Sequence, residues 1–126
     1  MDNKTADELK RRIESSVSPF HTVLYVMKEL DEAGFERLFL GRKWKLKKGG
    51  NYYVTRNHSA IIAFSIPQKP VWKFHIMASH SDSPSLKIKE NPEIEVENAY
   101  IKLNVERYGG MILSPWFDRP LSVAGR

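Results

Sequence analysis

The chain has 126 residues, 41% of them apolar, and a formal net charge of +5. This length supports one domain or part of a larger one. Because there is no cysteine, disulfides and thiolate ligands are excluded, and any metal site must use His, Asp and Glu. No apolar run reaches the length of a membrane span, and the first residues are polar, without a signal-peptide core. We therefore expect a cytoplasmic protein without membrane partners.

Two amphipathic helices are predicted at the start of the chain. Residues 5–16 carry apolar side chains at helical spacing, and Thr5 followed by Glu8 resembles a capping box. Ser18 offers an N-cap for a second helix, with Pro19 at the first helical position. One apolar stripe follows this second helix and consists of Phe20, Val23, Leu24, Met27 and Leu30.

After Gly34, which is expected to end the second helix, the apolar period changes to two. Gly49-Gly50 indicates a turn, and β-rich runs predict short strands at 35–39, 44–46, 52–56 and 60–66. A further strand is expected over 72–79, where Phe74, Ile76 and Ala78 alternate with His75, Met77 and Ser79. This run is apolar enough to be buried on at least one face. We expect it at the centre of a mixed sheet.

Part of the positive charge is concentrated between residues 37 and 48. An anionic or nucleic-acid partner is one interpretation of this basic segment. The other is a solvated hairpin, which we favour because Trp44 and Leu46 alternate with lysines as in an ordinary two-faced strand. The cations are Arg37, Arg42, Lys43, Lys45, Lys47 and Lys48, with no acidic residue among them.

The chain becomes polar at His80, directly after the predicted central strand. Pro84 lacks a backbone donor, so the strand must end before it. Open α/β sheets place ligands where such a buried strand ends in a polar loop. In extended backbone His80 and Asp82 point to the same side, so the imidazole could bind a metal while the carboxylate holds its other nitrogen. The alternative is a turn in which Asp82 caps a backbone donor. One histidine is not a zinc site, which takes at least three protein ligands.

The other histidines are expected to have ordinary structural roles. His21 lies near a helix start, His58 in a turn and His75 inside a predicted strand. We expect His21 to be a surface or capping histidine and not a metal ligand.

Past Pro84 the pattern becomes a strict alternation of apolar and polar residues. The runs 86–89, 94–97 and 101–106 predict solvated antiparallel strands with one buried face. Tyr108-Gly109-Gly110 then indicates a turn. The change of pattern near residue 85 predicts a boundary between two modules.

Several separated stretches resemble, in the expected order, the aspartyl-aminopeptidase family of zinc metallopeptidases. They are residues 78–86, Tyr108-Gly109-Gly110 and residues 116–126, and Ser18-Pro19-Phe20-His21 also resembles the family's N-terminal region. The resemblance spans nearly the whole chain, yet it covers only the first third or less of a family member.

This resemblance implies a co-catalytic exopeptidase with two zinc ions per active site in the parent enzyme, which removes N-terminal and often acidic residues. It implies that His80 is a zinc ligand and that Asp82 is a catalytic-site residue that orients it. The family's other ligands and its glutamate base occur in motifs without a counterpart here. Trp116-Phe117-Asp118-Arg119 resembles an inserted module that serves subunit contacts. We therefore interpret Asp118 as structural or assembly-related.

The expected fold is α/β. Residues 1–85 form the N-terminal part of a zinc-exopeptidase α/β domain, and residues 86–126 begin an antiparallel β-rich inserted dimerisation or assembly module. The expected function is the N-terminal segment of a zinc metallo-aminopeptidase that acts on peptides as a homo-oligomer, without a nucleic-acid partner, and is inactive as this chain alone. The alternative is a non-catalytic binding or assembly module whose basic hairpin engages an anionic partner.

Overall fold

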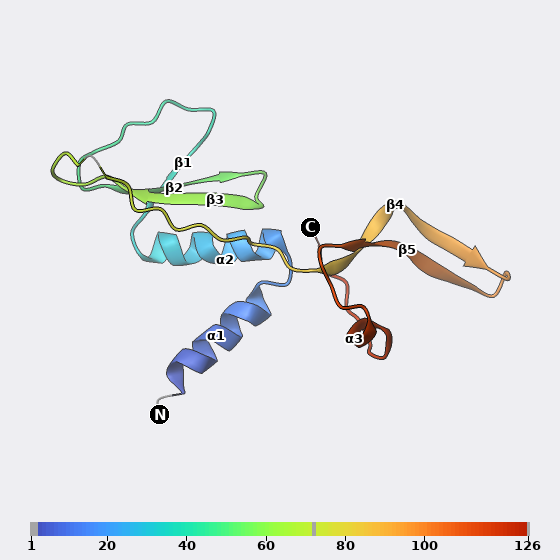
Figure 1. The fold of residues 1–126 in the computed structure, drawn as a ribbon. Helices are drawn as coiled ribbons and strands as arrows, with labels where there is room; N and C mark the ends of the chain where they lie inside the picture. The colour runs from blue at the N-terminus through green and yellow to red at the C-terminus, as the bar shows by residue number, and fades with distance from the viewer. Residues whose placement is uncertain (1–2, 72, 126) are drawn as a thin grey trace. The chain divides into compact units, whose positions relative to one another are not determined.

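The computed structural model describes residues 3–71 and 73–125. The chain divides into two compact units, Met1–Asp82 with Ala124–Arg126 and Ser83–Val123. The first unit contains helices α1 and α2 and a three-stranded sheet, and the second contains a long β-hairpin and a short helix (Figure 1). Helices and strands in one chain confirm the α/β composition expected from the sequence. Among the described residues, none of the helices combines the length and apolarity that a membrane crossing requires.

Helix α1 spans Lys4–Ser15, within one residue of the predicted range. The expected capping box is wrong, because Thr5 lies inside the helix and Asn3 occupies the N-cap without a side-chain cap. An ion pair connects the two helices: Arg12 binds Glu8 of α1 at 2.7 Å and Glu29 of α2 at 3.0 Å. These side chains are substantially exposed and solvated, so the pairs add little to stability.

Helix α2 spans Pro19–Glu32 and begins as the sequence predicts. Ser18 is its extended N-cap, and its hydroxyl accepts a hydrogen bond from the His21 backbone N–H at 3.4 Å. The same hydroxyl lies 2.7 Å from His21 Nδ1, so the expectation that His21 takes part in capping is confirmed. The helix ends at Glu32, and Gly34, two residues later, has a φ of +81°, a conformation that glycine adopts without steric cost.

The sheet has the order β1-β2-β3 and is mixed, as expected. Strand β1 (Glu36–Leu38) pairs in parallel with β2 (Asn51–Arg56), which pairs antiparallel with β3 (Ala60–Ser65). Asn57 and His58, at φ of 51° and 56°, make the tight turn between β2 and β3. Two positive φ values match the type I′ turn, whose twist suits a β-hairpin.

Adjacent residues of β2 bury their side chains on opposite faces of the sheet. Tyr52 is 1% exposed and belongs to a core cluster with Leu38 and Val54, against which Phe64 and Ile66 pack. Tyr53 is also 1% exposed, and its hydroxyl donates to Asp31 of α2 at 2.7 Å. Burial raises the pKa of Tyr53, and the hydrogen bond to Asp31 raises it further. Strand β2 therefore joins the sheet core to helix α2.

Residues 39–50 form an irregular loop, so the strand expected at 44–46 is wrong. This loop is held by side-chain hydrogen bonds and not by the backbone hydrogen bonds of a β-ladder. The Trp44 indole N–H donates to the Phe39 carbonyl at 2.9 Å, and the Tyr52 hydroxyl accepts from the Lys47 N–H at 2.8 Å. The predicted Gly49-Gly50 turn is confirmed, since Gly49 has a φ of +76° and a Cβ at Gly50 would collide with the Tyr52 ring.

The expected central strand is wrong for this chain. Residues 73–84 have no regular secondary structure and appear in Figure 1 as the yellow trace that follows β3. Residue 72, the first of the predicted strand, lies outside the described residues. Phe74, Ile76 and Met77 are 90%, 83% and 99% exposed. A strand requires a hydrogen-bonding neighbour, and no strand among the described residues pairs with this segment.

The second unit is built on the antiparallel hairpin of β4 (Ser85–Val96) and β5 (Tyr100–Tyr108). The runs predicted as separate strands at 86–89 and 94–97 belong, except for Glu97, to the one strand β4, whose register shifts between Ile88 and Glu93. Glu97 and Asn98, at φ of 53° and 52°, form the turn to β5. The short helix α3 (Ser114–Phe117) follows.

We expect Tyr53→Phe to lower the free energy of unfolding by about 1–2 kcal/mol, because it removes a hydrogen bond to a carboxylate from a buried ring without changing the packing. Urea denaturation followed by circular dichroism measures this change. The same substitution at the exposed Tyr100 is the matched control and should shift stability by less than about 0.5 kcal/mol. Equal effects at both positions would show that the Tyr53–Asp31 bond does not stabilise the fold.

Candidate functional site

His80 and Asp82 lie at the end of the exposed segment 73–79 and contact each other. His80 Nδ1 is 3.1 Å from Asp82 Oδ1 and 2.8 Å from the Asp82 carbonyl oxygen. The His80 side chain is 81% exposed and that of Asp82 is 34% exposed. Ser81, between them, donates its hydroxyl to the carbonyl of Ser59 in the β2–β3 turn at 3.1 Å. This hydrogen bond ties the pair to the sheet.

This geometry determines which nitrogen of the His80 ring is available to bind a metal ion. A proton on Nδ1 is donated to the two Asp82 oxygens, which leaves the Nε2 lone pair directed away from the pair. A carboxylate or carbonyl acceptor on one nitrogen is the usual arrangement behind a metal-bound histidine, because it selects the tautomer and increases ligand basicity. The pair can thus present one oriented nitrogen ligand.

The described residues fit one ligand position of a zinc site and not a complete site. Zinc takes at least three protein ligands, and no group of three or more His, Asp or Glu side chains that could hold a metal occurs in residues 3–71 and 73–125. Asp118 lies in the second unit as the C-cap of α3. His75 is exposed in the irregular segment, so its expected place inside a strand is wrong.

One cavity, of about 410 Å³, is lined by residues that are far apart in the sequence. It lies in the first unit, against α2, and its polar contributors are His21, His58 and Arg37. Arg37 Nε is buried and has no hydrogen-bond partner among the described residues. No local motif could have indicated this cavity, because its residues come from helix α2, strand β1, the β2–β3 turn and Gly125. The rest of its lining consists of Phe20, Val23, Leu24, Met27 and Gly125.

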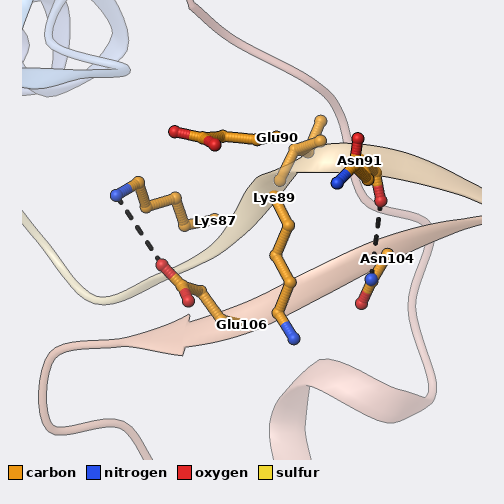
Figure 2. Close-up of a pocket in the computed structure, with 7 residues that line it drawn as sticks. Lys87, Lys89, Glu90, Asn91, Asn104 and Glu106 are labelled. Carbon is orange, nitrogen blue, oxygen red and sulfur yellow. Dashed lines mark hydrogen bonds and ion pairs between the residues drawn. The ribbon is translucent and has the colours of Figure 1, made fainter.

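Another cavity, of about 470 Å³, lies along the β4–β5 hairpin beside the register shift (Figure 2). Charges of both signs line it, and Lys87 and Glu106 pair across the strands at 3.6 Å. The amide of Asn104 donates to the Asn91 carbonyl at 3.5 Å. This lining contains neither a histidine nor a hydroxyl nucleophile, so His80 and Asp82 remain the candidate site.

Comparison with known proteins gives the context for this pair. Residues 12–126 match the family described as aminopeptidase I zinc metalloprotease (M18). A probable M18 family aminopeptidase 2 of Clostridium acetobutylicum is 53% identical over 116 residues, which are 90% of this chain and 27% of that protein. This chain therefore spans about a quarter of the length of that relative.

Solved structures show the same fold. Ape4, in its complex with Nbr1, superposes with a TM-score of 0.81 at 39% identity, over 86% of this chain and 21% of that one. The mApe1 dodecamer of Saccharomyces cerevisiae superposes with a TM-score of 0.74 over 91% of this chain and 27% of that one. Its 24% identity shows the shared fold alone. Because the family match covers most of the sequence, the chain belongs to the M18 family of aminopeptidase I zinc metalloproteases.

Proposed function

We propose that this chain supplies the N-terminal part of the catalytic unit of a zinc aminopeptidase, which removes N-terminal residues, often acidic ones, from peptides. The observation that carries this proposal is the contact of His80 Nδ1 with Asp82 in a member of a zinc metalloprotease family. The alternative of a non-catalytic module is not favoured, because the relatives matched over most of the chain are aminopeptidases.

In this proposal His80 and Asp82 have distinct roles. His80 offers Nε2 to one of two zinc ions, and Asp82 holds Nδ1–H, fixes the tautomer and raises the basicity of the ring. Bound zinc ions would polarise the scissile carbonyl and activate water for its hydrolysis. The hydrogen bond from Ser81 to the Ser59 carbonyl anchors the backbone between His80 and Asp82 to the β2–β3 turn. The remaining ligands and the general base come from outside residues 1–126, so this chain alone is inactive.

We further propose that residues 86–126 belong to an assembly module of a cytoplasmic homo-oligomer. Large apolar side chains are exposed in this unit, and exposed apolar surface of this kind marks interaction sites. The structural neighbour mApe1 is a dodecamer, which supports assembly as a property of the fold. The exposed side chains include Tyr100, Ile101, Leu103, Ile112, Phe117 and Val123.

The basic segment is not assigned a nucleic-acid role. Arg37 and Arg42 each lie over the Phe39 ring, at 5.2 and 5.0 Å from its centroid. These two cations therefore pack on an aromatic ring of the loop, which supports a structural role. Trp44 packs beside Phe64 of β3 at a centroid distance of 6.3 Å, so the apolar side of the loop faces the sheet.

His80→Ala in the full-length protein should reduce zinc content at one site and abolish most hydrolysis of a peptide with an N-terminal acidic residue. Asp82→Asn keeps the size of the side chain and removes its charge, so activity or metal affinity should fall about 10- to 100-fold. Elemental analysis and peptide hydrolysis measure both changes.

Asp118→Asn is the matched control for the second variant. It makes the same chemical change in the second unit and should retain zinc and activity, since Asp118 is interpreted as structural. If Asp82 served only as a turn cap, asparagine would replace it with little effect. Full activity of Asp82→Asn together with undiminished zinc in His80→Ala would refute the assigned roles.

Ile101→Lys should weaken assembly of the full-length protein. Ile101 is 66% exposed on β5 and pairs with Glu95 of β4, so a lysine there is compatible with the hairpin. Light scattering should show an oligomer for the unchanged protein and a shift to lower mass for the variant. If the unchanged full-length protein is a monomer in this measurement, the assembly proposal is wrong.

The protein should not bind DNA or RNA more tightly than about micromolar at physiological salt, because phosphate-dominated binding requires a dedicated cationic surface. Fluorescence anisotropy with labelled duplex DNA and single-stranded RNA measures this affinity over a salt series. Submicromolar binding with a steep salt dependence would show that the basic segment has an anionic partner.

A further inference from the structure

The cavity of about 410 Å³ against α2 has a cationic side and an apolar side. Arg37, His21 and His58 supply its side-chain nitrogens, and the apolar side consists of α2 side chains, among them Phe20 and Met27. In the part of the chain that the structure describes, no Asp or Glu side chain lines it. Its volume lies in the range of about 300–1,000 Å³ that small-molecule sites occupy. These features suit a small ligand that is anionic at one end and apolar at the other.

Arg37 brings to this cavity a charge that no carboxylate pairs with in residues 3–71 and 73–125. Its Nε is buried and has no hydrogen-bond partner among these residues, which is rare for a buried donor. The guanidinium carbon lies over the Phe39 ring, 5.2 Å from its centroid, so the ring covers one face of the guanidinium plane. All five N–H donors lie in that plane. The ring contact therefore does not satisfy these donors, whereas an anion in the cavity can.

Two histidines line the cavity together with Arg37. His21 Nδ1 is 2.7 Å from the Ser18 hydroxyl. When this hydroxyl donates to Nδ1, the proton of the neutral ring is on Nε2, which can then donate to a ligand. His58 lies in the β2–β3 turn, where its side chain is exposed. Each histidine can thus add one hydrogen bond to an anion that Arg37 holds.

We propose that this cavity binds a carboxylate that carries an apolar group, either a small free molecule or the C-terminal residue of a peptide. The guanidinium fork matches a carboxylate with two parallel hydrogen bonds, and the apolar side chains of α2 bury the apolar group. An inorganic anion would leave these side chains in water, and an ammonium group would find no Asp or Glu among the described lining residues. The cavity contains neither His80 nor Asp82, so this inference stands apart from the proposed function.

Isothermal titration calorimetry of the full-length protein tests the site with two matched probes. N-acetyl-leucine has both the carboxylate and the apolar group, and N-acetyl-leucinamide replaces only the carboxylate by a neutral amide. We expect a Kd below about 1 mM for N-acetyl-leucine, as suits a ligand of this size. The amide should bind at least about 10-fold more weakly, because the charge-assisted hydrogen bonds to Arg37 are lost. No binding of N-acetyl-leucine, or equal affinity for the two probes, would overturn the proposal.

Variants assign the binding to the cavity. Arg37→Gln should weaken N-acetyl-leucine at least about 10-fold. Arg42→Gln is its matched control, because Arg42 lies over the same Phe39 ring at 5.0 Å but does not line the cavity, and its affinity should be unchanged. His58→Gly removes an imidazole and makes an Asn-Gly pair that suits the turn, so it should fold and bind about threefold more weakly. Equal weakening in the two arginine variants, or unchanged affinity in His58→Gly, contradicts the proposed site.

Hydrogen exchange and one further variant locate the probe. N-acetyl-leucine should slow exchange in peptides covering 19–27 and leave those covering 100–108 unchanged, and protection confined to other regions would show that the cavity is not the site. His80→Ala should bind the probe like the unchanged protein, whether or not it loses zinc. Loss of the probe in this variant would place it at the proposed metal site and would also refute the cavity assignment.

An N-acetylated tripeptide that ends in leucine distinguishes the two sources of the carboxylate. Affinity equal to or above that of N-acetyl-leucine assigns the cavity to a peptide C-terminus, because the added residues fit outside it. Weaker binding assigns the cavity to a small free carboxylate. Both results support the carboxylate site, provided that Arg37→Gln weakens the ligand that binds more tightly. Binding of that ligand without any dependence on Arg37 would refute the site.

Discussion

The first unit depends on strand β2 being buried on both of its faces. Tyr52 is held between the sheet core and the loop that follows β1, since its ring lies 5.7 Å from that of Phe64 and its hydroxyl accepts from Lys47. Tyr53 points to the other face, where it binds Asp31 of α2. Because these residues are adjacent, any slip of β2 by one position would exchange the two faces and break both sets of contacts.

The burial of Tyr52 also explains the glycine at position 50, at the end of the loop that follows β1. A side chain at Gly50 would collide with the Tyr52 ring, so the close approach of loop and ring requires glycine. The backbone of the loop then closes onto the end of β3, where Ile66 donates to Gly50 and Gly49 donates to Ile66, each at 2.8 Å. A loop rich in lysines is thereby ordered without a strand of its own, and its cations can remain in water while its aromatic residues pack.

The His80–Asp82 pair shows how a local contact and a complete site differ. Side chains two positions apart lie on the same side of an extended backbone, and here the His80 ring and the Asp82 carboxylate form a hydrogen bond. A zinc site also needs ligands that are distant in sequence, and the described residues do not bring such a group together. The pair therefore presents one oriented imidazole nitrogen, and we propose zinc as the metal it binds because the chain belongs to a zinc metalloprotease family.

The sequence by itself determined the features that depend on near neighbours. Helix α2 begins at Ser18-Pro19, the two helices have nearly the predicted bounds, β2 and β3 lie where predicted, and His80 contacts Asp82. Each of these needs only a cap, a turn or a partner a few residues away. The tertiary structure decided the state of residues 73–79 and 44–46, two runs with strand-like patterns that are not strands. A strand forms only when another strand lies beside it and pairs with its backbone. The alternation of apolar and polar side chains does not show whether the fold provides such a neighbour.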